Sequence, residues 1–333
     1  MELSTLWFIL IAVLFIGFFF LEGFDYGTLI LMPFIGKTDV ERRIIINTIG
    51  PVWDGNEVWL LTAGGAIFAA FPNWYATMFS GFYLALFLIL VALIFRSVAF
   101  EFRSKIDSVR WKKSWDLALF LGSAIPALLW GVAFANLLKG VPIDADMEYV
   151  GNFFNLLSPY TLVAGLTGLA VFVYHGAVYI SLKTTDVLLK RSQAIALKVG
   201  LVAIGLWVVL LILSFVTFDS VKLSVAVTLV LGTLAVLASY YFMRKEKSGK
   251  AFIANGIAIV FVVASIFLGL FPNVMVSSIN EAYNLTVTSA SSSPYTLKVM
   301  TIVALTMVPI VLAYQAWSYW IFRKRVTGDK LEY

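Results

Sequence analysis

The sequence contains no cysteine and a single histidine, His175, among its 333 residues. Without cysteine the chain cannot form a disulfide, a thiolate metal site, an iron–sulfur cluster or a covalently attached c-type haem. One histidine cannot supply both axial ligands of a haem. We therefore expect the chain to hold no metal and no stoichiometric cofactor, so that metal chemistry is supplied largely by another subunit.

Charged residues are also scarce, at 13% of the chain against 61% hydrophobic residues. An ordinary soluble domain is about a quarter charged, so the composition excludes a soluble globular protein. Long apolar runs, rather than short alternating segments, indicate membrane helices rather than a β-barrel. The net charge of +5 is concentrated in a few loops, which favours a topology signal over nucleic-acid binding.

We predict an all-α integral membrane protein with one membrane domain, residues 1–333. A spanning helix needs ~20 apolar residues. Nine stretches meet this requirement: 6–33, 44–70, 75–95, 115–138, 159–181, 194–218, 221–242, 251–271 and 296–322.

Lysine and arginine collect in alternate connections between these stretches and in the C-terminal tail. The residues are Lys37, Arg42, Arg43, Arg103, Lys105, Arg110, Lys112, Lys113, Lys183, Lys190, Arg191, Arg244, Lys245, Lys247, Lys250, Arg323, Lys324 and Arg325. Because basic loops stay in the cytoplasm, this pattern predicts an outside N-terminus and a cytoplasmic C-terminus. An odd number of spans is then required, and nine spans satisfy it.

Two pairs of carboxylates lie inside predicted helices, where an ionisable group costs ~3 kcal/mol or more. Glu22 and Asp25 share one face of the first helix, and Asp54 and Glu57 share one face of the second. Asp54 is about ten residues, or ~15 Å, from the cytoplasmic surface, which places it near mid-membrane. Proton handling, or a place beside a cofactor, is predicted for Asp54 and Glu57, with structural hydrogen bonds as the alternative. For Glu22 and Asp25 the alternative is hydration at the helix end.

Other polar residues have simpler interpretations. His175 is interpreted as a packing residue rather than a haem ligand or proton relay. Arg96 and Arg103 stand where the third helix leaves the membrane, so we expect them to extend to the surface, with Glu101 compensating their charge.

Glycines accompany the carboxylates on the first two helices, at Gly23, Gly27, Gly64 and Gly65. Small residues let helices approach closely. We therefore expect these two helices to face a partner subunit or an internal water-filled path rather than lipid.

Longer motifs run through the whole chain. They are Gly23–Gly27, Glu41–Arg43, Trp53–Leu60, Thr62–Ala66, Phe79–Tyr83, Phe102–Ile106, Gly151–Leu157 and Ala316–Trp320. Together these motifs closely resemble subunit II of the cytochrome bd-type quinol oxidases.

The resemblance implies a subunit of a heterodimeric terminal oxidase that reduces O2 to water with electrons from quinol. Subunit I would carry haem b and haem d, and this haem-poor chain would stabilise it and be inactive alone. A small single-helix subunit often accompanies the pair. The expected location is the cytoplasmic membrane of a bacterium or archaeon, with membrane lipid and no nucleic acid as partners.

The resemblance also directs attention to particular residues. Asp54 matches a position on a cytoplasmic proton route, with Asp25 as a second element, and Glu57 and Glu22 are further candidates. Trp53 is the candidate for proximity to a structural quinone or a haem.

Two other classes of function remain as alternatives. The chain would be a proton-coupled transporter if its midplane carboxylates moved substrate, but transporters commonly have matching halves, and the second half offers no counterpart beyond His175. In a purely structural scaffold the polar residues would only fix helix packing.

Overall fold

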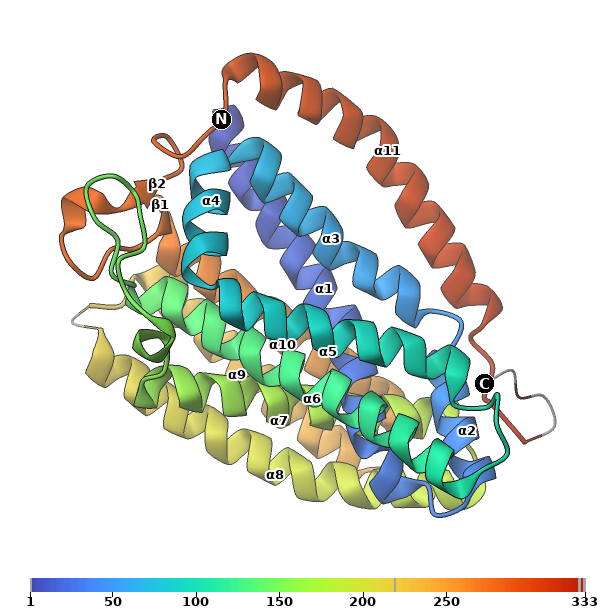
Figure 1. Ribbon diagram of the computed structural model, residues 1–333. Coiled ribbons are helices and arrows are strands. Elements are labelled where there is room, and N and C mark those ends of the chain that lie inside the picture. The colour runs from blue at the N-terminus through green and yellow to red at the C-terminus, as the bar shows by residue number, and fades with distance from the viewer. Residues whose placement is uncertain (1, 219, 329–330, 332–333) are drawn as a thin grey trace.

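The computed structural model describes residues 2–218, 220–328 and 331, and these residues are mostly helical (Figure 1). The α-helices are α1 (Leu3–Ile35), α2 (Asp39–Ile49), α3 (Trp53–Ala70), α4 (Pro72–Gly81), α5 (Tyr83–Phe102), α6 (Val109–Lys139), α7 (Pro159–Lys183), α8 (Asp186–Thr217), α9 (Leu223–Arg244), α10 (Ser248–Leu270) and α11 (Pro294–Ile321). The short elements are the 3-10 turns η1 (Phe153–Leu156) and η2 (Glu281–Tyr283) and the strands β1 (Asn273–Met275) and β2 (Leu285–Thr286).

Eight helices in the described part of the chain, α1 and α5 to α11, are long and apolar enough to cross a membrane. Seven of them correspond to one predicted stretch each, whereas the predicted stretch 75–95 is divided, because α4 ends at Gly81 and α5 begins at Tyr83. The remaining stretch, 44–70, is divided, because α2 ends at Ile49 and α3 begins at Trp53. Pro51 lies in this interruption and has no N–H group with which to continue a helix. The prediction of one continuous second helix is therefore wrong, and a total of nine crossings stays a prediction.

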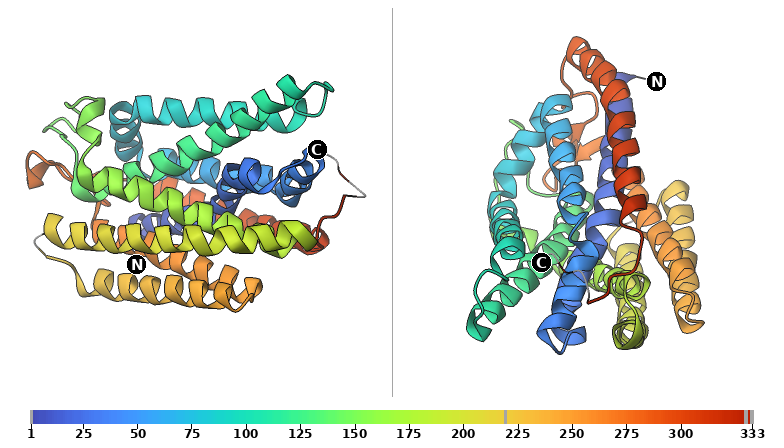
Figure 2. Two further views of the ribbon diagram at one scale, coloured as in Figure 1. Left: turned by 90° about the horizontal axis from the view of Figure 1, so that it is seen from below. Right: turned by 90° about the vertical axis from the view of Figure 1, so that its right-hand side faces the viewer.

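Helix α1 lies at the centre and contacts α3, α6, α7 and α10. The left-hand view of Figure 2 shows α5 and α6 on one side of α1 and α8 to α10 on the other. The closest approach is to α7, where a Cβ atom on Gly27 would lie 1.9 Å from the backbone oxygen of Phe172. The expected close packing at Gly27 is thus confirmed. A Cβ atom on Gly64 or Gly65 would have no neighbour within 4 Å, so close packing is not seen there.

Helix α11 stands apart from this bundle (Figure 1). Leu297 is the one residue of α11 that is buried. Near it, the Trp7 indole Nε1 of α1 donates to the Leu297 oxygen at 3.2 Å and to the Thr301 hydroxyl at 3.1 Å. Most of the surface of α11 is consequently open.

The basic connections lie together at one end of the bundle. There Arg103, after α5, donates to Asp39 at the start of α2 at 2.9 Å, and Arg191 of α8 donates to the Ile35 oxygen at 3.1 Å. At the opposite end the loops 140–158 and 271–293 pack together, and the Val141 N–H donates to the backbone oxygen of Val276, next to β1, at 3.0 Å. The structure thus separates the two ends by charge, and which end faces the cytoplasm remains the prediction made from the basic loops.

We expect Gly27→Ala to lower the amount of folded chain in the membrane. The added methyl group would meet the backbone of α7, and such overpacking costs about 1–3 kcal/mol or more. Gly205→Ala is the matched control, because a Cβ atom there has no neighbour within 4 Å. Thermal unfolding of the purified protein measures both variants, and equal midpoints would contradict the expectation.

Candidate functional site

A fully buried arginine, Arg96 of α5, forms the centre of the candidate site. Its Nη2 atom pairs with Glu22 of α1 and with Glu57 of α3. Its guanidinium carbon lies 4.9 Å from the centroid of the Tyr26 ring. The expectation that Arg96 extends to the membrane surface is wrong, because two carboxylates from other helices draw it inward.

A chain of hydrogen bonds continues from this cluster through Asn56, which is fully buried. The Asn56 Nδ2 atom donates to Asp25 Oδ2 at 2.7 Å. On its other side Asn56 Oδ1 accepts from the Tyr319 hydroxyl at 2.7 Å and from Gln315 Nε2 at 3.5 Å. The indole of Trp59 in turn donates to Gln315 Oε1 at 3.0 Å. The site therefore draws on α1, α3, α5 and α11, and Asn56, Gln315 and Tyr319 were not predicted from the sequence.

The cluster contains more acid than base. Glu22 and Glu57 pair with one guanidinium, that of Arg96, and the third carboxyl group, that of Asp25, accepts from Asn56. If all three carboxyl groups were ionised, two negative charges would lack a counter-ion. Buried oxygens of Glu22 (Oε2) and Asp25 (Oδ1) have no hydrogen-bond partner in the described structure, and neither do Nε and Nη1 of Arg96. Unmet donors beside unmet acceptors are the conditions under which buried water is held.

Asp54 does not join this cluster. It lies in the first turn of α3 and is exposed on the surface of the chain. Its predicted position ten residues into a continuous helix is wrong, because the backbone is interrupted just before it. The neighbouring Trp53 ring lies flat on Phe100, with centroids 4.4 Å apart. Proximity of Trp53 to a quinone or haem stays a prediction.

A second charged network joins α2, α5 and α6 at the basic end. Arg103 Nε lies 2.6 Å from Asp116 Oδ1, and Arg42 Nη1 lies 2.6 Å from Asp116 Oδ2. Arg103 is 2% exposed, so the expectation that it extends to the surface is also wrong. Burial raises the pKa of the Asp39 carboxyl, but hydrogen bonds from Lys112 and Arg103 outweigh this effect and lower the pKa.

His175 is fully buried between aromatic rings. Its imidazole stacks on Phe252, with centroids 4.6 Å apart, and Nε2 lies 3.1 Å from the backbone oxygen of Phe20. Because a carbonyl oxygen only accepts, Nε2 carries the proton. The Nδ1 atom is buried without a hydrogen-bond partner in the described structure, and the stacking against Phe252 agrees with the packing interpretation, which stays a prediction.

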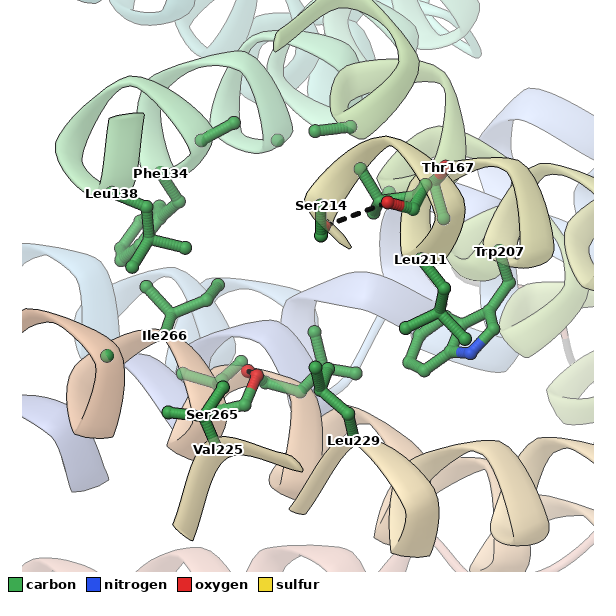
Figure 3. Close-up of a pocket in the computed structure, with 18 of the residues that line it drawn as sticks. Phe134, Leu138, Thr167, Trp207, Leu211, Ser214, Val225, Leu229, Ser265 and Ile266 are labelled. Atoms are coloured by element: carbon green, nitrogen blue, oxygen red, sulfur yellow. Dashed lines mark hydrogen bonds between the residues drawn. The ribbon is translucent and has the colours of Figure 1, made fainter. Parts of the chain in front are cut away.

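A separate apolar cavity of about 290 Å³ lies among α6 to α10 (Figure 3). Hydroxyl groups of Thr167, Ser214 and Ser265 line it, and each donates to a backbone oxygen of its own helix. Among the residues that the structure describes, the lining includes no carboxylate. Arg96 and its carboxylate partners are not among the lining residues, so this cavity is separate from the cluster.

The chain matches known proteins over nearly its whole length. The family model described as cytochrome bd terminal oxidase subunit II matches residues 3–322. Cytochrome bd ubiquinol oxidase subunit 2 of Bacillus subtilis is 47% identical over 98% of this chain and 97% of that protein. Cytochrome bd-I ubiquinol oxidase subunit 2 of Escherichia coli is 39% identical over 99% of this chain and 97% of that protein.

A solved structure shares the fold. One chain of the bd oxidase from Geobacillus thermodenitrificans superposes with a TM-score of 0.80 at 15% identity, covering 97% of this chain and 99% of that chain.

We expect Arg96→Gln to destabilise the chain by about 3–5 kcal/mol, because it leaves buried Glu22 and Glu57 without a counter-charge. Adding Glu22→Gln should restore part of this loss by removing one uncompensated charge. Arg110→Gln, at an exposed position, is the control. Thermal unfolding of the purified protein compares the four forms, and a double variant no more stable than Arg96→Gln would contradict the expectation.

Proposed function

We propose that this chain, which belongs to the family of cytochrome bd terminal oxidase subunit II, stabilises subunit I of a quinol oxidase and supplies a proton path to it. Haems of subunit I would supply electron transfer and oxygen reduction. The quinol, the small single-helix subunit and the location in a cytoplasmic membrane are parts of this proposal. The buried cluster around Arg96 is the observation that carries the proton path.

The open face of α3 is the proposed contact with subunit I. Asp54, Val58, Leu61, Gly65 and Phe68 follow one another at intervals of three or four residues and are all exposed. Helix α11 leaves most of its own surface open beside this face. Large exposed apolar faces mark interaction sites. A carboxylate and glycines on such a face favour a protein partner, because charge is costly against acyl chains.

The charge balance of the cluster supports the proton path. A membrane interior does not tolerate two uncompensated negative charges, so part of the carboxyl set retains protons. Reduction of O2 to water takes up one proton for each electron, and these protons must reach subunit I. We propose that Asp25 and Glu22 pass protons toward Glu57, whose side chain is 18% exposed at the edge of the open face. Asp54 stands on the same face, one turn away.

The acid–base chemistry requires no other group of this chain. Each carboxyl group binds a proton at one of its oxygens and later releases it, so only O–H bonds are made and broken. Arg96 stays charged and limits how many carboxyl groups lose their protons together. Water bound to the unmet donors and acceptors would close the gaps between carriers.

We expect Asp25→Asn and Asp54→Asn each to slow quinol-dependent oxygen uptake about 10²-fold or more while the haem spectrum stays intact. Asparagine keeps the shape and much of the hydrogen bonding but carries no proton. Asp107→Asn is the control, because that side chain is 99% exposed in a loop. Near-normal turnover with a normal spectrum would show that the substituted carboxylate is structural or redundant.

A further inference from the structure

We propose that Asn56, held by Gln315 and Tyr319 of α11, is a positioning residue that orients the Asp25 carboxylate for proton transfer. This inference rests on the proposed proton path through Asp25. It gives α11 a role in orienting a buried side chain of the cluster.

The direction of the hydrogen-bond chain follows from a group that can only donate. The indole nitrogen of Trp59 has no lone pair to accept with, so its partner in Gln315 must be the amide oxygen. The amide nitrogen of Gln315 then faces Asn56, and the Asn56 oxygen receives it. The amide nitrogen of Asn56 is thereby left to face Asp25.

The Tyr319 hydroxyl reinforces this orientation. It donates to Asn56 Oδ1 at 2.7 Å, which is shorter than the 3.5 Å contact from Gln315. If Asn56 were turned over, its nitrogen would face the Gln315 nitrogen, and two donors would meet. The side chains from α11 therefore select one orientation of the buried amide.

The two carboxyl oxygens of Asp25 therefore differ in their hydrogen bonding. Oδ2 accepts from Asn56 at 2.7 Å, whereas Oδ1 is buried and has no partner in the described structure. A fixed donor at Oδ2 disfavours a proton on that oxygen. Oδ1 is therefore the atom that binds and releases the transferred proton, and Asn56 holds it in one place. Misplacing such a carrier by about 1 Å can cost ~10²-fold in rate.

A second contact between α11 and the bundle, which lies away from Asn56, provides a control. Near its beginning, Thr301 accepts from Trp7 and makes no contact with the cluster. Thr301→Val weakens this tie, whereas Tyr319→Phe weakens the tie that reaches Asn56. If α11 acted only as a packing element, the two changes would have similar effects.

The experiment measures quinol-dependent oxygen uptake of the purified complex in H2O and D2O. We expect Asn56→Leu to slow turnover about 10²-fold and Tyr319→Phe about 2-fold to 10-fold, the range for one hydrogen bond. Both should raise the solvent isotope effect, because proton transfer becomes more rate-limiting. Thr301→Val should leave both quantities unchanged. Asn56→Leu added to Asp25→Asn should cause no further loss, since Asn56 acts through Asp25.

Each other outcome is decisive. Additive losses in Asn56→Leu and Asp25→Asn, or equal effects of Thr301→Val and Tyr319→Phe, overturn the inference. If Asp25→Asn slows oxygen uptake but Asn56→Leu and Tyr319→Phe do not, the role of Asn56 is overturned and the proton path stands. If Asp25→Asn has normal turnover, the proposed proton path itself is overturned. If Asn56→Leu does not assemble, Tyr319→Phe, which removes one hydroxyl group, decides by its rate and isotope effect.

Discussion

The pairing of Arg96 with Glu22 and Glu57 is the interaction on which the middle of the molecule depends. A charge buried in a membrane protein is costly unless it is paired, and this arginine links α5 to α1 and α3 through its two carboxylate partners. Helix α6 closes the site from outside, since a Cβ atom on Gly122 would lie 2.7 Å from the Arg96 side chain. The pairing is incomplete, because Asp25 adds a third carboxyl group, and this excess of carboxyl groups is the basis of the proposed proton path.

The broken second helix serves the same site. Because α3 begins anew at Trp53, Asn56 and Glu57 point inward while Asp54 and Leu61 remain on the open face. One short helix thus connects the interior cluster with the surface that we propose contacts subunit I. Helix α11 adds Tyr319 and Gln315 to the same network, although little of its surface is buried in this chain. The two helices proposed to contact subunit I, α3 and α11, therefore also contribute side chains to the hydrogen-bond network around the proposed proton carriers.

Much of this arrangement follows from the sequence, and the exceptions depend either on contacts between helices or on the interruption at Pro51. Apolar run length locates the membrane helices, and the cost of buried charge singles out Glu22, Asp25 and Glu57. The direction of Arg96 could not be predicted, because an arginine near a helix end usually reaches the membrane surface. Its inward direction depends on acids from other helices, as does the link between Arg42 and Asp116, 74 residues apart. Asp54 was misplaced because hydropathy does not register the interruption at Pro51.

In the proposed proton path, the cluster around Arg96 holds a proton that moves during turnover. Infrared difference spectroscopy of the complex, between its oxidised and reduced states, detects the C=O stretch that only a protonated carboxyl group shows. We expect a change in this band in the native complex that is lost in Asp25→Asn and retained in the exposed control Asp107→Asn. If substitution of Asp25, Glu22 and Glu57 in turn left the band unaffected, the cluster would not be the site of the moving proton.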